Sequence, residues 1–199
     1  MRISLVYPYS GHGGEDPGAV SDYNSAVMEK NINLHIAMQI KAELEADGYT
    51  VMMTRTEDTL VYDENAKGET AMRRQDLTRR RQLMDESGAD IIVSIHLNKY
   101  TDPKIHGAQT FFVKESKSSQ KLAVSIQNSI VKNVEPENTR VALLKKEDII
   151  ITKNSTVTTA IVECGFLSNR EDEEKLSQPE YQDKLAHAIK IGIDEYFTA

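Results

Sequence analysis

Four side chains that could hold and use a metal ion are spread along the chain. His12 lies in the glycine-rich stretch Gly11–Gly14, Glu29 opens an amphipathic segment, and His96 ends an apolar run. Two histidines and a carboxylate form a ligand set of catalytic zinc sites, which leave a fourth position for water. Such a metal lowers the pKa of water and polarises a substrate carbonyl. These positions match no compact zinc motif, so spacing alone leaves open that His96 is a core histidine bonded to a neighbouring carbonyl.

The fourth side chain, Glu163, directly follows the apolar residues Ala160-Ile161-Val162. A purely structural role is unfavourable there, because a buried carboxylate without a partner is costly. A metal-dependent hydrolytic site also needs a general base within hydrogen-bond reach of the attacking water. Glu163 is our candidate for that base.

The elements that must position these residues alternate along the chain. The run Ile91–Leu97 is rich in Ile and Val and is typical of a strand buried on both faces. We predict further strands at residues 3–7, 49–55, 107–113, 149–151 and 158–163, helices at 29–47, 70–87, 116–133 and 179–196, and a long loop at 57–70 over the site. This alternation predicts an α/β fold with a mostly parallel sheet and helices on both faces. If the strands are parallel, His12, His96 and Glu163 meet at the edge where such sheets bind ligands.

Length and composition narrow the class of protein. The 199 residues suit a single domain spanning the whole sequence. The net charge of −7 argues against binding to nucleic acid. No apolar run approaches the roughly 18 residues that cross a bilayer. Residues 1–7 are too short for a signal peptide, so we expect the targeting segment of an exported protein to lie outside this sequence.

An arginine-rich segment lies between residues 73 and 81. We interpret it as the solvated face of a helix, supported by an Asp76–Arg80 pair four residues apart. An anion-binding role for one or two of these arginines stays open.

The remaining histidines and the single cysteine have simpler interpretations. His35 and His187 fall in predicted helices and His106 in a loop, so we expect surface roles for them. Cys164 has no second cysteine to pair with and is expected to be a small buried residue.

Four segments resemble the signature motifs of the zinc-dependent N-acetylmuramoyl-L-alanine amidases of the Amidase_3 type. They are Gly11–Gly14, Glu29–Leu34, Ser94–Asn98 and Val162–Asn169, in the order of the family. The resemblance implies a six-stranded α/β fold. It also implies hydrolysis of the amide that joins the lactyl group of N-acetylmuramic acid to L-alanine in peptidoglycan.

Residue roles follow from the same resemblance. Transferred motif by motif, it implies that His12, Glu29 and His96 bind Zn²⁺ and that Glu163 is the catalytic glutamate.

Further segments resemble the spore-cortex branch of this family. They are Gly107–Phe111, Ile126-Gln127, Asn138-Thr139-Arg140 and Tyr196–Thr198. The branch resemblance implies that removal of the stem peptide prepares muramic acid for conversion to the δ-lactam of the spore cortex, which germination requires. It therefore implies an extracytoplasmic location in the cell wall or cortex.

One departure from the family pattern bears on the metal. The family usually has Asp-Pro-Gly-His or Asp-Ala-Gly-His, whereas this chain has Tyr9-Ser10-Gly11-His12. A carboxylate that could orient a ligand or support the loop is missing, and metal affinity depends on such partners. We expect an accessory protein to supply wall affinity, and that protein could also hold the zinc loop.

Two other functions remain as alternatives. A zinc carboxypeptidase acting on the stem peptide would release a terminal amino acid rather than a free lactyl carboxylate. A non-catalytic peptidoglycan-binding module would have lost a ligand or Glu163, and here all four positions are occupied.

Overall fold

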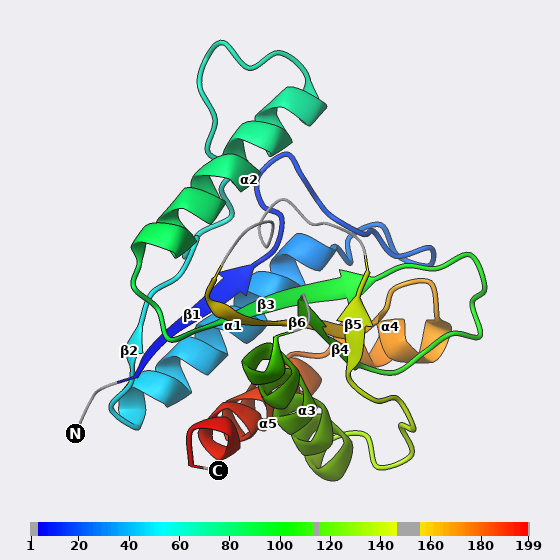
Figure 1. Ribbon diagram of the computed structural model, residues 1–199. Coiled ribbons are helices and arrows are strands. Elements are labelled where there is room, and N and C mark those ends of the chain that lie inside the picture. Colours follow the sequence, from blue (N-terminus) through cyan, green and yellow to red (C-terminus); the bar gives the residue numbers. More distant parts are fainter. Residues whose placement is uncertain (1–3, 114–115, 147–155, 199) are drawn as a thin grey trace.

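The computed structural model describes residues 4–113, 116–146 and 156–198, and its centre is a six-stranded sheet of order β2-β1-β3-β6-β4-β5 (Figure 1). The strands are β1 (Leu5–Ser10), β2 (Thr50–Val51), β3 (Ile91–Asn98), β4 (Gln109–Val113), β5 (Leu143–Lys145) and β6 (Thr158–Phe166). Only β4 and β6 pair in antiparallel fashion, while the other neighbours are parallel. The predicted α/β fold with a mostly parallel sheet is confirmed.

Helices cover both faces of the sheet. They are α1 (Glu29–Ala46), α2 (Glu69–Glu86), α3 (Lys117–Asn133), α4 (Arg170–Leu176) and α5 (Pro179–Thr198). The apolar sides of α1, α3 and α5 form the main core with one face, whereas α2 packs on the other (Figure 1). None of the helices in the described parts of the chain is long and apolar enough to cross a membrane.

The alternation of side chains along β3 explains why one strand serves both the core and the site. Val93 and Ile95 point into the main core, while Ile92 packs on the α2 side. Because successive strand residues point to opposite faces, His96 faces the α2 side, away from the main core. His96 therefore lies near the end of β3 on the sheet face that α2 covers, where a ligand can approach it.

The structure differs from the predicted elements in several places, and β1 runs to Ser10 instead of ending at residue 7. The strand predicted at 49–55 is limited to β2, because beyond it the chain leaves the sheet and Arg55 turns inward. The short element α4 was not predicted, although Asn169 caps it by accepting a hydrogen bond from the Asp172 amide. Strand β5 was not predicted either, and β6 continues past Glu163. The strand predicted at 149–151 lies outside the described residues.

Candidate metal centre and active site

The segment between β1 and α1 brings His12 beside Glu29. His12 has a φ of 60°, a left-handed conformation that is uncommon for a residue with a side chain. Gly11 is required because a Cβ there would lie 2.4 Å from Cε1 of His96. A Cβ on Gly18 would lie 2.6 Å from Oε2 of Glu29. The glycines therefore leave the space that the two histidines and the glutamate occupy.

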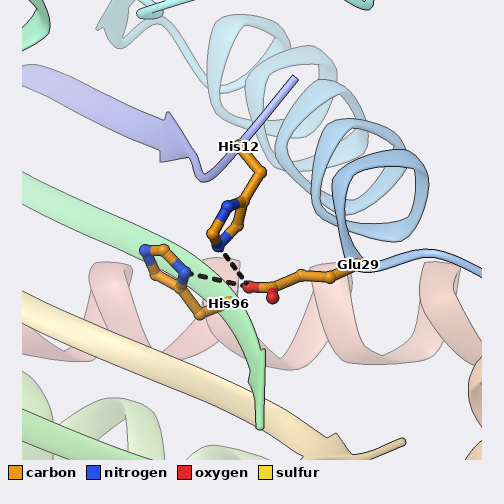
Figure 2. Close-up of side chains that lie close together, drawn as sticks. All are labelled: His12, Glu29 and His96. Carbon is orange, nitrogen blue, oxygen red and sulfur yellow. Dashed lines mark hydrogen bonds and ion pairs between the residues drawn. The ribbon is translucent and has the colours of Figure 1, made fainter. Parts of the chain in front are cut away.

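The three predicted ligands converge on one point. Oε1 of Glu29 lies 3.3 Å from Nε2 of His12 and 3.0 Å from Nδ1 of His96. Figure 2 shows both imidazole rings directed at this carboxylate, and the ligand atoms of all three residues lie within 4.8 Å of one another. Residues far apart in sequence thus form a compact donor set of two nitrogens and one oxygen.

Hydrogen bonds from the surrounding backbone fix the Glu29 carboxylate, which is 3% exposed. Its Oε2 accepts from the Ala19 amide at 2.8 Å, and its Oε1 accepts from the Leu97 amide at 3.0 Å. Burial alone would raise the pKa of Glu29, but hydrogen bonds to the two histidines hold it well below its usual range. Glu29 is therefore ionised and oriented before any ligand arrives.

A second carboxylate orients His12 from the opposite side of its ring. Nδ1 of His12 lies 2.8 Å from Oδ2 of Asp16, and the same oxygen lies 3.0 Å from Nε of Arg73. Burial would lower the pKa of His12, but Asp16 and Glu29 outweigh it and raise that pKa to about 9. Metal-binding histidines commonly bond their second nitrogen to a carboxylate. Asp16 thus gives His12 the carboxylate partner that the residues before Gly11 do not supply.

Two buried arginines hold the backbone of the His12 segment. Nη1 of Arg80 donates to the Ser10 carbonyl at 2.7 Å, and its Nη2 donates to the His12 carbonyl at 2.9 Å. Arg55 donates to the intervening Gly11 carbonyl at 3.1 Å. Three consecutive carbonyls are therefore fixed by two guanidinium groups.

This arrangement corrects our interpretation of the arginine-rich segment. The Asp76–Arg80 pair forms, but it is buried rather than solvated, since Arg80 is 1% exposed and Asp76 is 2% exposed. The helix spacing predicted the pair but could not show that α2 turns this side toward the sheet. The backbone carbonyls that Arg80 meets there carry no sequence signal.

Replacing Arg80 with alanine is expected to lower the free energy of unfolding by about 3–5 kcal/mol, because Asp76 would stay buried without its partner. Urea denaturation followed by circular dichroism measures the change. Arg81→Ala is the matched control, since Arg81 pairs with Asp85 at 3.4 Å near the surface, and such changes usually fall within about 0.5 kcal/mol. Equal losses in the two variants would contradict the role given to Arg80.

Glu163 lies directly beside the cluster. It is paired in register with His96 across β3 and β6, and it is 9% exposed. Among the described residues, its Oε2 has no hydrogen-bond partner. Burial raises the pKa of Glu163 above its usual value. An unpaired buried carboxylate oxygen is costly, so its persistence here points to a ligand or water outside the protein chain.

The residues present fit a divalent metal. A compact set of two imidazoles and one ionised carboxylate, each oriented by further hydrogen bonds, matches the donor chemistry of catalytic zinc sites.

The other histidines and Cys164 lie where the sequence suggested. His35 pairs with Asp183 and His187 pairs with Glu43, each at 2.8 Å on the surface between α1 and α5. His106 is exposed and Cys164 is buried. Their surface and core roles are confirmed.

The α/β sheet, with a His-Glu-His cluster and a buried glutamate at one edge, is typical of a metal-dependent hydrolase. The chain belongs to the N-acetylmuramoyl-L-alanine amidase family, whose sequence profile matches residues 9–195. The family predicted from the four motifs is therefore confirmed.

Relatives of known sequence or structure cover almost the whole chain. The germination-specific N-acetylmuramoyl-L-alanine amidase of Bacillus subtilis is 37% identical over 194 residues, which are 98% of this chain and 80% of that protein. The CwlD amidase of Clostridioides difficile, solved in complex with the GerS lipoprotein, superposes with a TM-score of 0.94 at 35% identity, covering 99% of both chains. An N-acetylmuramoyl-L-alanine amidase from Clostridium difficile 630 superposes with a TM-score of 0.85 at 28% sequence identity, covering 99% of this chain and 98% of that chain.

Proposed function

We propose that this chain is a zinc-dependent amidase that cleaves the bond between N-acetylmuramic acid and L-alanine in peptidoglycan. The observation that carries the proposal is the buried Glu163, which lies in register with His96 and whose Oε2 has no hydrogen-bond partner among the described residues, inside a chain of the amidase family. In this proposal His12, Glu29 and His96 bind the zinc ion and Glu163 is the catalytic residue.

The reaction assigns a proton-transfer role to Glu163. Zinc held by the three ligands would polarise the lactyl carbonyl and make water more acidic. Glu163 accepts a proton at Oε2 while the water oxygen adds to the carbonyl carbon. The same proton then passes to the amide nitrogen of L-alanine as the carbon–nitrogen bond breaks. A carboxyl whose burial raises its pKa is suited to both steps, because it holds the proton long enough to deliver it.

Asp16 and Arg80 act on this chemistry through His12. Asp16 fixes the orientation of the imidazole ring, and Arg80 fixes the backbone that carries it. Neither side chain needs to touch the substrate. We also propose that residues 1–199 form one catalytic domain, since the family match runs from residue 9 to residue 195.

We propose that the amidase acts on the spore cortex, outside the cytoplasm. The similarity to a germination-specific amidase and to CwlD supports this role. Deleting the gene from a sporulating host is expected to yield cortex without muramic δ-lactam, measured by chromatography of digested muropeptides. The wild-type gene should restore the lactam and a Glu163→Gln copy should not. Normal lactam content after deletion would refute the cortex role.

We propose that an accessory protein recruits or supports the enzyme. The chain carries a net charge of −7, so long-range attraction to a wall polymer that also bears carboxylates is not expected. The similar CwlD amidase was solved in complex with a lipoprotein, which supports the same arrangement here.

Weak binding of the purified chain to peptidoglycan is the expected result of a sedimentation assay. Activity should rise when an extract from sporulating cells is added. Strong, salt-insensitive binding by residues 1–199 alone would contradict the need for a helper.

A further inference from the structure

An arginine side chain is held in place by Gln109, the residue of β4 that neighbours Glu163 in the sheet. Gln109 of β4 lies directly opposite Glu163 in the antiparallel pair with β6, so both side chains point to the same face. Nη1 of Arg140 donates to Oε1 of Gln109 at 2.7 Å, and Nε of Arg140 donates to the His106 carbonyl at 2.7 Å. The guanidinium carbon lies 5.1 Å from the ring centroid of Phe166, which ends β6.

These contacts orient the guanidinium group but leave its charge uncompensated. The two hydrogen-bond acceptors are a neutral amide and a neutral carbonyl, and the third contact is an aromatic ring. Within the described residues no carboxylate pairs with Arg140 and its Nη2 has no hydrogen-bond partner. An arginine fixed in this way presents its remaining N–H groups, chiefly those of Nη2, as preorganised donors for a carboxylate.

The anchor of Arg140 is itself rigid. Gln109 is 8% exposed, and its amide nitrogen donates to the Val141 carbonyl at 3.0 Å, which sets the oxygen toward Arg140. The Arg140 amide donates to Oδ1 of Asn138 at 2.9 Å. The side chain therefore loses little further freedom when it binds a ligand.

We propose that Arg140 binds the free α-carboxylate of the second residue of the stem peptide. This inference rests on the proposed amidase function. The second residue of peptidoglycan stem peptides is a γ-linked glutamate, which leaves its α-carboxylate unused by the chain. Two residues of extended peptide span about 7 Å from the scissile amide. The Cβ atoms of Gln109 and Glu163 lie roughly 5 Å apart across the strand pair, and the Arg140 guanidinium lies one side chain beyond Gln109. The distance from Glu163 to this guanidinium is therefore similar in scale to the length of the dipeptide.

The test compares two glycan strands that differ in one group. Both carry uncrosslinked stem peptides, and the second residue bears a carboxylate in one and a carboxamide in the other. The wild-type enzyme is expected to cleave the carboxylate form about tenfold or more faster in kcat/KM, because one hydrogen bond to a charged group has an effect of that size. No variant is needed for this first arm.

The second arm uses charge-changing variants. Arg140→Gln should lower kcat/KM about 10- to 100-fold on the carboxylate strand, mainly through KM, and by less than about threefold on the carboxamide strand. Arg140→Lys should restore part of the loss. Arg170→Gln is the matched control, because Arg170 lies over the ring of Tyr23 at 5.0 Å but on the exposed surface of α4.

The outcomes separate this inference from the proposed function. Equal losses on both strands would show that Arg140 only supports its loop, and no loss on either would also overturn the inference. In both cases the amidase function stands. If the zinc-loaded wild-type enzyme cleaves neither strand even with the extract from sporulating cells added, the amidase function itself fails, and this inference fails with it. Thermal unfolding of each variant checks that the fold is intact.

Discussion

Replacing Glu163 with glutamine is expected to lower kcat by about 10²–10⁴-fold while the fold and the metal content stay unchanged. Glutamine has nearly the same shape as glutamate but cannot accept a proton from water. The substitution also removes the cost of a buried carboxyl whose Oε2 has no partner among the described residues, so no loss of stability is expected. Steady-state kinetics on peptidoglycan, with zinc measured on the same sample, tests both parts.

Glu173→Gln provides the matched control for Glu163→Gln. Glu173 is also buried, at 4% exposed, but its Oε1 accepts a hydrogen bond from the Ser21 hydroxyl at 3.0 Å. This glutamate is satisfied by the protein and should be dispensable for turnover. Near-normal kcat in zinc-loaded Glu163→Gln would show that the general base lies elsewhere.

Replacing His96 with alanine is expected to reduce bound zinc from one ion per chain to almost none and to abolish activity. In a zinc site with three protein ligands, each ligand supplies a large part of the free energy of zinc binding. The change also removes the partner that lies 3.0 Å from Glu29. Elemental analysis of the dialysed proteins measures the zinc content, and circular dichroism checks that the chain stays folded.

His187→Ala is the matched control, because it removes an imidazole that pairs with Glu43 on the surface. The zinc content of this variant should equal that of the wild type. His12→Ala should behave like His96→Ala. Unchanged zinc in both His12→Ala and His96→Ala would overturn the ligand assignment.

The strands and helices that position the site could be predicted because they have strong hydrophobic periodicity in the sequence. The buried run of β3 and the i+4 spacing of Ile32, Ile36, Ile40 and Leu44 in α1 placed His96 and Glu29 correctly at the ends of elements. Parallel pairing of β1, β3 and β6 then brings their carboxyl ends together. The approach of His12, His96 and Glu163 follows from that topology, whereas Glu29 joins them because the His12 segment leads into the start of α1.

The residues that support the site were harder to foresee. Asp16 acts only because a left-handed turn at His12 returns the chain toward the ring, and a sequence does not specify that turn. Arg80 looked like a surface residue because helical spacing gives its neighbours on the helix but not the side that faces the sheet. The partners of Arg80 are backbone carbonyls of a segment distant in sequence. Because every residue carries a carbonyl, the sequence does not mark these partners.

The identity of the bond that is cut tests the central claim most directly. We expect mass spectrometry of peptidoglycan treated with the zinc-loaded enzyme to show glycan strands with a free lactyl carboxylate and stem peptides with a free L-alanine amino group. The Glu163→Gln protein should give neither product. Release of a terminal amino acid from an otherwise intact stem peptide would contradict the claim and identify a carboxypeptidase instead.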